Sequence, residues 1–512
     1  MATTRFAAID IGSYYVSMEI FELSKKNGLK SINHLRQRLE LGKDTYNHKK
    51  LSREKIDKLC RILSDFKLVM EEYQVKDYRA CAKSAFREAK NMVLMVDQVY
   101  QHTGILIEVL SNSEQRFLGY KAIASKEIDF HRMIEKGTAI IDMGGGSVQV
   151  SLFDKDALIS TQNIPVGSMR TREHLAVLGR ETTKPEQIVE EIVRKDIQAF
   201  KRLYLKDRKI TNVILVGDYF TNLIFHNKAK GSSLITRDTF MEWYHDMMGK
   251  SDMSLSIEMN VPMEFASVIL PTAVIYRRLI DELGAENIWL PGIQLTDGLA
   301  YDYGEKHQII RTNHDFENDI IMSTKNIAKR YTSSQKHTNH LVMIADGIFD
   351  GLKKASHLTS RDKLLLKIAV MLHDCGKYVS MTNVSECSYN IVMSTEIIGL
   401  SHAERELIAY VVRYHSREFE YYGESSMRGT LTKEEYMRVA KLCAILGITN
   451  ALDRSHMQKI IQIKSFVRDG KLVIQAEHKG DFTLEAESIA RKTGFFEEIF
   501  NIQPILKLKK HI

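Results

Sequence analysis

The stretch Asp142-Met-Gly-Gly-Gly-Ser147 is a glycine-rich turn that follows an apolar run, and a shorter turn of the same kind, Asp10-Ile-Gly-Ser13, stands near the start of the chain. The apolar runs that lead into these turns, residues 138–142 and 6–11, are predicted to be buried strands. Because glycine has no side chain, the backbone of such a turn can approach an anion closely. Successive N–H groups in the turn then form a cradle for phosphate oxygens. Two such turns, each followed by another strand-rich segment, predict a duplicated domain that binds phosphate.

Each turn also carries side chains that suit a phosphate site. The serines add hydroxyl donors, and Asp10 and Asp142 stand where a carboxylate can hold Mg²⁺ or its waters against the same phosphates. One turn of this kind alone is more often an ordinary tight turn, whereas the presence of two favours phosphate binding. The predicted phosphate-binding residues of the two turns are Gly12, Ser13, Gly144, Gly145, Gly146 and Ser147.

Four longer segments have a more specific pattern: AAIDIGSYYVSMEIFEL at 7–23, SAFREAKN at 84–91, LSNSEQRFLGYKAI at 110–123 and IDMGGGSVQVSLF at 141–153. In these segments the chain resembles the exopolyphosphatase and guanosine pentaphosphate phosphohydrolase (Ppx/GppA) family, within the actin-like ATPase superfamily. PVGSMR at 165–170 and LTDGLAYD at 295–302 fit the second domain of that family, and residues 337–456 fit its helical, HD-like third domain. The resemblance therefore covers nearly all 512 residues.

The spacing of apolar residues along the chain predicts four domains. Strands alternate with helices over 1–124 and again over 125–303, which indicates two α/β domains with central sheets. Helical spacing dominates over 304–460, and residues 461–512 contain a predicted β-hairpin with an Asp-Gly turn and a helix. Together with the resemblance, this pattern gives an α/β fold class: two actin-like (ribonuclease H-like) domains, an all-α HD-like domain and a small α+β C-terminal cap.

The resemblance implies hydrolysis of a terminal phosphoanhydride bond by in-line attack of water between the two actin-like domains, where a glutamate positions the water. Here Glu114 falls on the first glutamate of the family motif and Gln115 on the second, catalytic one, and Gln149 replaces another functional glutamate. An amide can orient a water molecule but cannot accept its proton. A loose phosphoryl-transfer transition state depends mainly on positioning and charge neutralisation. A hydrolase that uses Gln115 or Glu114 and a slow or inactive protein therefore both stay open.

Two other segments concern the substrate. Ser84 and Arg87 match the phosphate-contacting segment of the family, and an arginine suits bidentate binding of phosphate. The alternative is a surface arginine that pairs with Glu88. At Val216-Gly-Asp-Tyr-Phe-Thr221 the family has a glycine-rich turn, and here Phe220 and the tyrosine before it predict a shortened or altered substrate channel.

His337, His373-Asp374 and Asp453 follow the H…HD…D order of the HD phosphohydrolases. Imidazoles and carboxylates together suit a divalent transition metal or Mg²⁺. These four residues are therefore predicted to bind a second divalent metal, and the alternative is a set of buried structural histidines. Two more histidines stand nearby in the sequence, His415 and His456.

Composition predicts a cytoplasmic protein and is compatible with a polyanionic substrate. The five cysteines form no CxxC pair, and their odd number argues for free thiols in a reducing compartment. The start of the chain has no signal-peptide pattern, and no run approaches roughly 18 consecutive apolar residues, so neither export nor membrane insertion is expected. A net charge of +7 assists capture of a polyanion if the charges gather in a cleft. We expect no nucleic acid partner, and we expect a homodimer because the HD-like region often serves dimerisation in this family.

Three hypotheses for function follow. The first is an Mg²⁺-dependent hydrolase of inorganic polyphosphate or guanosine pentaphosphate, with polyphosphate favoured because no base-reading motif is visible. The second is a protein that binds polyphosphate or guanosine penta- and tetraphosphate without efficient hydrolysis, which the glutamines at the family's glutamate positions suggest. The third and weakest is hydrolysis of a nucleotide in the HD-like region.

Overall fold

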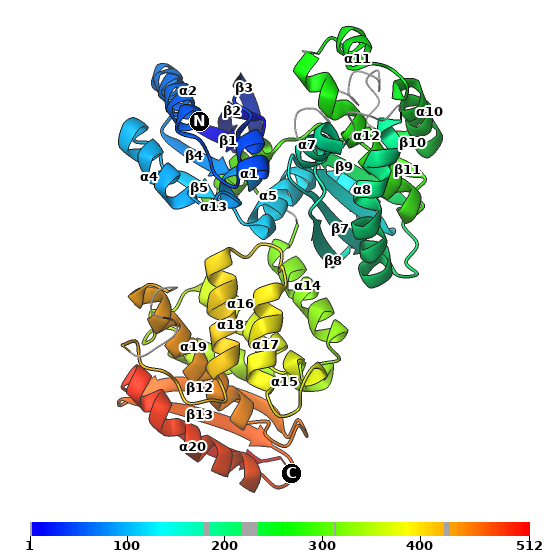
Figure 1. Cartoon of the computed structure of the whole chain (residues 1–512). Helices are drawn as coiled ribbons and strands as arrows, with labels where there is room; N and C mark the ends of the chain where they lie inside the picture. Colours follow the sequence, from blue (N-terminus) through cyan, green and yellow to red (C-terminus); the bar gives the residue numbers. More distant parts are fainter. Residues whose placement is uncertain are drawn as a thin grey trace. The chain divides into compact units, whose positions relative to one another are not determined.

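The computed structural model describes residues 3–511 apart from 126, 179–183, 218–233, 262, 312–313, 424–426 and 428–430, and it describes no side chains at 127–129, 264 and 265. The chain divides into two compact units, Met1–Asp315 and Phe316–Ile512, whose elements are labelled in Figure 1. The boundaries placed at residues 124, 303 and 460 from the sequence remain predictions.

The first unit contains a five-stranded sheet in the order β3-β2-β1-β4-β5. Its strands are β1 (Thr4–Ile11), β2 (Tyr15–Ser24), β3 (Gly28–Arg38), β4 (Asp77–Ala82) and β5 (Ile107–Val109). The first three strands are antiparallel, whereas β4 runs parallel to β1 and β5 parallel to β4. Successive side chains of a strand point to opposite faces. Ala7, Ile9 and Ile11 therefore belong to one core, while Phe6 and Ala8 belong to another.

Helices cover both faces of this sheet. The core around Ile9 includes residues of α2 (Arg53–Glu72) and α4 (Met92–Thr103). The core around Phe6 includes Leu118 of α5 (Asn112–Ala124) and Leu299 of α13 (Leu295–Lys306). The chain thus returns to the first sheet at α13 after it has formed the second sheet (Figure 1).

The second sheet repeats the first one. Its order is β10-β11-β9-β6-β7-β8, in which β8-β7-β6-β9-β11 has the same directions as β3-β2-β1-β4-β5. The strands are β6 (Thr138–Met143), β7 (Val148–Asp154), β8 (Ala157–Ile164), β9 (Asn212–Gly217), β10 (Leu234–Thr236) and β11 (Asn287–Trp289). Asp10 pairs with Ser17 in the first sheet, and Asp142 pairs with Gln149 in the second. The predicted α/β fold of two actin-like domains is confirmed.

The remaining helices of the first unit pack around these sheets and place the loops of the cleft. α8 and α12 supply Val189, Val193, Ile275 and Leu279 to the large core of the second sheet. The bounds of these helices are α1 (Leu41–His48), α3 (Ser84–Arg87), α6 (Glu127–Ile134), α7 (Ser168–Leu178), α8 (Pro185–Phe200) with a π-turn (Lys201–Leu205), α10 (Arg237–Met247), α11 (Asp252–Glu258) and α12 (Met263–Leu283).

The second unit is helical over most of its length, as the sequence predicts. Its helices are α14 (Phe316–Arg330), α15 (Gln335–Leu352), α16 (Ser360–Leu372), a 3₁₀ turn (Cys375–Tyr378), α17 (Val384–Ser394), α18 (His402–Tyr414), α19 (Lys433–Ala451) and α20 (Thr483–Phe500).

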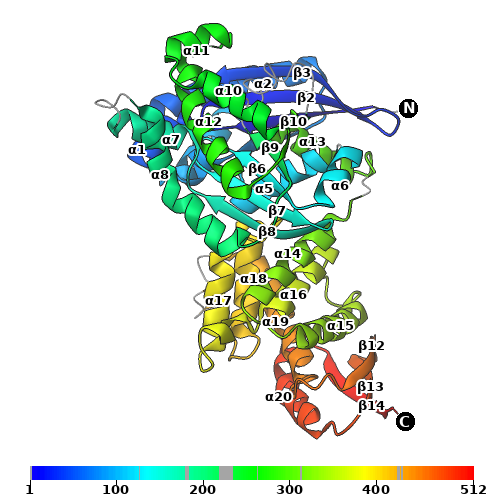
Figure 2. The same ribbon diagram turned by 90° about the vertical axis from the view of Figure 1, so that its right-hand side faces the viewer.

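A three-stranded sheet completes the second unit. β12 (Ile460–Arg468) and β13 (Lys471–His478) form the expected hairpin, and β14 (Gln503–Lys510) lies parallel to β13, as Figure 2 shows. Both turn residues, Asp469 and Gly470, have positive φ angles of 51° and 69°. A two-residue turn of this kind matches the twist of the strands it joins.

Two further observations concern the environment of the chain. All five cysteines are free, as predicted. In the described part of the chain, every helix is too short or too polar to span a membrane.

Candidate functional site

The two glycine turns lie at the ends of β1 and β6, and a pocket opens beside them. Residues from both sheets line it, and among them are Asp10, Ser13, Lys83, Gln115, Asp142 and Gly217. The enclosed cavity has a volume of about 50 Å³. A single water requires roughly 10–15 Å³ by the same kind of measure, so the enclosed part has room for a few waters or one small anionic group. Five residues predicted for this site, Asp10, Gly12, Ser13, Gln115 and Asp142, thus share one pocket.

The two turns have the same backbone geometry. The amide of Gly12 donates to the carbonyl oxygen of Tyr15 at 2.8 Å, and the amide of Gly144 donates to that of Ser147 at 2.9 Å. In each half, the amide of the turn's first glycine is therefore already engaged. The amides that follow it in each turn are therefore the candidates for anion binding.

The turns also contact each other closely. A Cβ atom at Gly145 would lie 2.9 Å from Cβ of Ser13, and one at Gly146 would lie 2.5 Å from the hydroxyl of Tyr46. A Cβ at Gly167 would overlap the backbone of the second turn itself. Glycine is therefore needed here for the approach of one turn to the other, in addition to any role in anion binding.

A small hydroxyl cluster lies under this contact. Tyr46 shares hydrogen bonds with Oγ of Ser13 at 2.7 Å and with Oγ of Ser84 at 2.8 Å. Burial raises the pKa of the Tyr46 hydroxyl, so it is protonated near neutral pH. The sequence prediction placed Ser13 and Ser84 at the phosphate. The structure adds Tyr46, which holds both serines.

Arg170 connects the second glycine turn to the first half of the unit. Its Nη2 donates to both carboxylate oxygens of Glu88 at 2.7 and 2.6 Å, and its Nε donates to the carbonyl oxygen of Gly146 at 2.7 Å. Its guanidinium also lies 4.8 Å from the ring centroid of Tyr46. Glu88 thus pairs with Arg170.

Arg87 and Glu114 position the helix that carries Gln115. Arg87 donates to the carbonyl oxygen of Leu110 at 2.6 Å and to the side chain of Asn112, which fixes the start of α5. The carboxylate of Glu114 accepts the amide of Ser111 at 2.9 Å in a capping box. Neither side chain lines the pocket, whereas Gln115 does.

Gln149 lies beside the pocket and is buried, with 1% of its surface exposed. Its Oε1 accepts a hydrogen bond from Nε of Arg116 at 3.2 Å. Gly144, Gly145, Gly146 and Ser147 also do not line the enclosed pocket, although they form the turn next to it. Val216 and Gly217 line the pocket, and the predicted bulky turn at 218–221, with Phe220, lies outside the described residues.

The sequence prediction missed Lys83. This residue follows directly on β4 and precedes α3, and its Nζ lies 3.0 Å from Oδ2 of Asp10. The signal was available, because a residue just after a strand parallel to β1 lies at the same sheet edge as Asp10.

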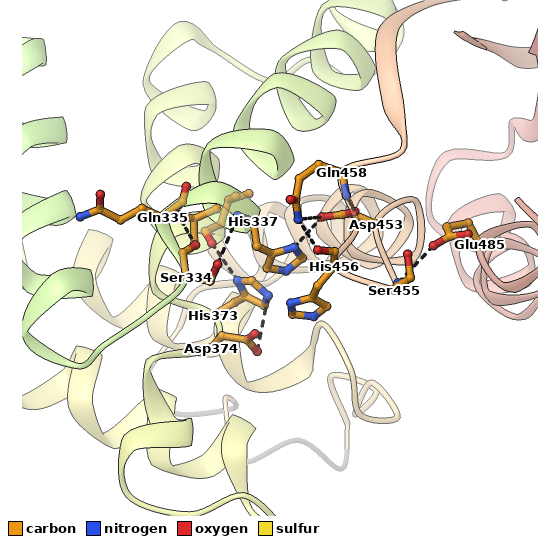
Figure 3. Close-up of polar contacts among 12 residues, drawn as sticks. Ser334, Gln335, His337, His373, Asp374, Asp453, Ser455, His456, Gln458 and Glu485 are labelled. Atoms are coloured by element: carbon orange, nitrogen blue, oxygen red, sulfur yellow. Dashed lines mark hydrogen bonds and ion pairs between the residues drawn. The ribbon is translucent and has the colours of Figure 1, made fainter. Parts of the chain in front are cut away.

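A second cluster of candidate residues lies in the second unit (Figure 3). His337 is on α15, His373 caps the end of α16, and Asp374 precedes the 3₁₀ turn. One ligand atom from each of these three residues lies within 4.8 Å of the others. Three of the four predicted HD ligands thus come together.

Hydrogen bonds fix the tautomers of both histidines. Nδ1 of His337 faces Oδ2 of Asp453 at 2.7 Å, and Nδ1 of His373 faces the carbonyl oxygen of Val370 at 2.7 Å. Because both oxygens are acceptors, each Nδ1 carries the hydrogen and each Nε2 carries the lone pair. Within the described part of the chain, Nε2 of His337 has no hydrogen-bond partner, and Nε2 of His373 lies 3.5 Å from Oδ1 of Asp374 without forming a hydrogen bond. This is the tautomer in which imidazole binds a metal through Nε2.

The fourth predicted ligand has a different place. Asp453 is fully buried, accepts from the amide of Gln458 at 2.8 Å, and orients His337. It does not belong to the group of three. A carboxylate behind a ligating histidine is the usual outer partner of a metal site.

Charge and burial in this cluster favour neutral imidazoles beside an anion. Burial lowers the pKa of His373, and it lowers the pKa of His415 to about 3. Burial alone would raise the pKa of Asp374, but His373 and Lys377 outweigh it and hold the pKa below its usual range. The His456 ring stacks on His337 with 3.6 Å between ring centroids, and the His415 ring lies 5.1 Å from His373. At neutral pH His373 therefore offers a lone pair beside the carboxylate of Asp374.

Each of the two units matches a model of a known protein family. The model of the Ppx/GppA phosphatase family matches residues 20–307, and the model of domain III of the Ppx/GppA phosphatases matches residues 321–488. A guanosine-5′-triphosphate,3′-diphosphate pyrophosphatase of Vibrio campbellii is 19% identical over 467 residues, which cover 86% of each chain.

Two other relatives match part of the chain. A bifunctional 3-dehydroquinate synthase/phosphatase of Fusobacterium nucleatum is 25% identical over 217 residues, which are 41% of this chain and 32% of that protein. The match therefore spans about a third of that bifunctional protein. The crystal structure of an exopolyphosphatase from Cytophaga hutchinsonii superposes with a TM-score of 0.51 at 16% identity, over 60% of this chain and 99% of that one. This likeness concerns the fold.

Proposed function

Since this chain belongs to the Ppx/GppA phosphatase family, we propose that it hydrolyses the terminal phosphoanhydride bond of inorganic polyphosphate, or of guanosine pentaphosphate, in the cleft between its two actin-like sheets. The family consists of phosphohydrolases. The observation that supports this cleft most directly is that Asp10, Asp142 and Gln115 line one pocket beside a glycine turn.

A divalent cation fits the donors of this pocket. Ppx/GppA phosphatases use divalent metal ions, and carboxylate oxygens are the ligands that Mg²⁺ prefers. Asp142 and Asp10 would hold Mg²⁺, which would neutralise charge on the phosphate oxygens. We therefore infer that Mg²⁺ is the cation of the cleft.

The residues of the chain have separate tasks in this reaction. Amides of the glycine turns bind phosphate oxygens, and the amide side chain of Gln115 orients the attacking water. The water oxygen forms a bond to the terminal phosphorus while the bond from that phosphorus to the bridging oxygen breaks. The proton of the water passes to a phosphate oxygen, because an amide cannot accept it.

Polyphosphate is the favoured substrate. The excess of basic residues suits a long polyanion, and no base-reading motif is visible in the sequence. The name of the Vibrio campbellii relative supports the nucleotide instead, so both substrates belong in the first experiment. A homodimer in the cytoplasm remains part of the proposal.

The test is phosphate release from long-chain polyphosphate and from guanosine pentaphosphate, with Mg²⁺ and after its removal by EDTA. We expect release with Mg²⁺ and a loss to background without it. Saturable binding of either compound without release would favour a binding protein and would contradict the hydrolase.

We also infer that the second unit binds a divalent transition metal through His337, His373 and Asp374. Nitrogen-rich sites of this kind suit Zn²⁺, Fe²⁺ or Mn²⁺ more than Mg²⁺. The support comes from the two buried Nε2 atoms that face the same space as the Asp374 carboxylate.

Removal of His373 is the corresponding prediction. His373→Ala is expected to weaken Zn²⁺ binding to the full chain by at least 10²-fold, and Asp453→Ala by roughly 10- to 100-fold because it only orients a ligand. Isothermal titration with ZnCl₂ measures both values. His402→Ala is the control, since that histidine is exposed at the start of α18. Equal affinity in all four proteins would show that the cluster is structural.

A further inference from the structure

Lys83 is a cation that lies within ion-pair distance of Asp10, a predicted metal ligand in the cleft. Its backbone amide donates to the carbonyl oxygen of Ile11 at 3.2 Å, so the residue is fixed at the end of β1. Its side chain and that of Asp10 are 11% and 16% exposed, and their charged atoms are 3.0 Å apart. A Cβ atom at Gly12 would lie 3.6 Å from Nζ of Lys83. The ammonium therefore lies directly at the first glycine turn.

At this position, the ammonium of Lys83 and a divalent cation compete for the carboxylate of Asp10. A lysine ammonium binds a carboxylate through the same oxygen lone pairs that a divalent cation uses. Mg²⁺ binds Asp10 less strongly while Nζ of Lys83 remains 3.0 Å from Oδ2 of Asp10. Arg36 lines the same pocket, and its guanidinium donates to Oε1 of Gln294 at 3.5 Å.

An anion in the pocket changes this balance. The ammonium of Lys83 has three donors and a flexible stem, so it can turn from Asp10 to a phosphate oxygen without a change in the backbone. Phosphate carries more negative charge than one carboxylate and therefore draws the ammonium away. Asp10 is then available to the metal.

We propose that the ammonium of Lys83 competes with Mg²⁺ for Asp10 in the empty pocket. When substrate enters, the same ammonium binds the phosphate group. This inference rests on the proposed phosphate site and adds to it a residue with a defined role. It also implies that metal and phosphate assist each other's binding, since each coupling between two ligands is reciprocal.

The test uses the full chain and two titrations that need no turnover. Lys83→Met removes the charge and keeps the length of the side chain. We expect Mg²⁺ to bind this variant about tenfold more tightly than wild type in the absence of anion, and inorganic phosphate to bind about tenfold more weakly in the absence of metal. The opposite signs are the signature, because a lysine with a merely structural role would weaken both.

Three further variants make the result specific. Lys83→Arg keeps the charge and should bind both ions within about threefold of wild type. Arg36→Met removes another cation of the same pocket and should not tighten Mg²⁺ binding. In an Asp10→Asn background, Lys83→Met should leave Mg²⁺ affinity unchanged, because the carboxylate for which Lys83 and Mg²⁺ compete is absent. Lys83→Gln replaces Lys83→Met if the latter does not show wild-type thermal unfolding.

The inference would be overturned if a folded Lys83→Met protein bound Mg²⁺ no more tightly than wild type. It would also be overturned if Lys83→Met raised Mg²⁺ affinity by the same factor in the Asp10→Asn background. Because neither titration depends on catalysis, absence of phosphate release from the wild-type protein would contradict the proposed function and leave this measurement valid.

Discussion

Asp142→Ala is expected to lower phosphate release from polyphosphate on the order of 10³-fold or more. Asp142 lies one residue before the end of β6, beside the second glycine turn, and its carboxylate lines the pocket. Removal of a single group that stabilises transition-state charge typically costs roughly 10²- to 10³-fold, and loss of a metal ligand adds to this. The rate is measured as free phosphate from long-chain polyphosphate at saturating Mg²⁺.

The control for Asp142→Ala is His373→Ala, which changes the second unit. This variant should keep the rate of the wild-type protein, because His373 belongs to a different compact unit. If Asp142→Ala keeps full turnover while His373→Ala loses it, the reaction belongs to the histidine cluster and the cleft assignment fails. Thermal unfolding of both variants shows whether a lost rate reflects a lost fold.

Gln115→Glu is expected to raise the rate by roughly 10²-fold, which is the low end of what general-base assistance contributes. Gln115 lines the pocket on α5, whose start is fixed by the Ser111 capping box and by Arg87. Glutamate has nearly the same shape and can accept the proton that an amide cannot.

A matched control for Gln115→Glu is available within the pocket. Gln294→Glu makes the same chemical change at the start of α13 and should not accelerate the reaction. An equal increase in both variants would mean that added negative charge, rather than proton transfer, improves the cleft. No increase at Gln115 would mean that water positioning alone sets the rate.

Local sequence signals were enough to predict the strands that carry the two glycine turns. Apolar runs that end in glycine gave β1 and β6, and the Asp-Gly pair gave the hairpin of β12 and β13. The duplicated glycine turns in the sequence were enough to predict that Asp10 and Asp142 lie in one pocket. These features depend on residues that are close together in sequence or on a repeat that the sequence displays.

Other features depend on partners that are distant in sequence, and there the sequence was insufficient. The pair of Glu88 and Arg170 is one example, and the contact of Tyr46 with Ser13 and Ser84 is another. The sequence predicts only a hairpin and a helix in the C-terminal cap, and it does not predict β14, whose partner β13 is separated from it in sequence by α20. Asp453 was grouped with the metal ligands by motif order, and only its hydrogen bond to His337 revealed its orienting position.

The ion pair of Glu88 and Arg170 has a consequence for the time course of a catalytic cycle. It ties the second glycine turn to the first half of the unit without help from any ligand. In many two-lobed proteins, the bound molecule must bring the lobes together. The apparent affinity is then the intrinsic affinity multiplied by the fraction of molecules that are already closed. Here the chain itself joins the two halves through this ion pair, so entry of substrate and departure of the cleaved phosphate past this contact both require the guanidinium and the carboxylate to separate. We expect opening, rather than closure, to set the pace of repeated turnovers.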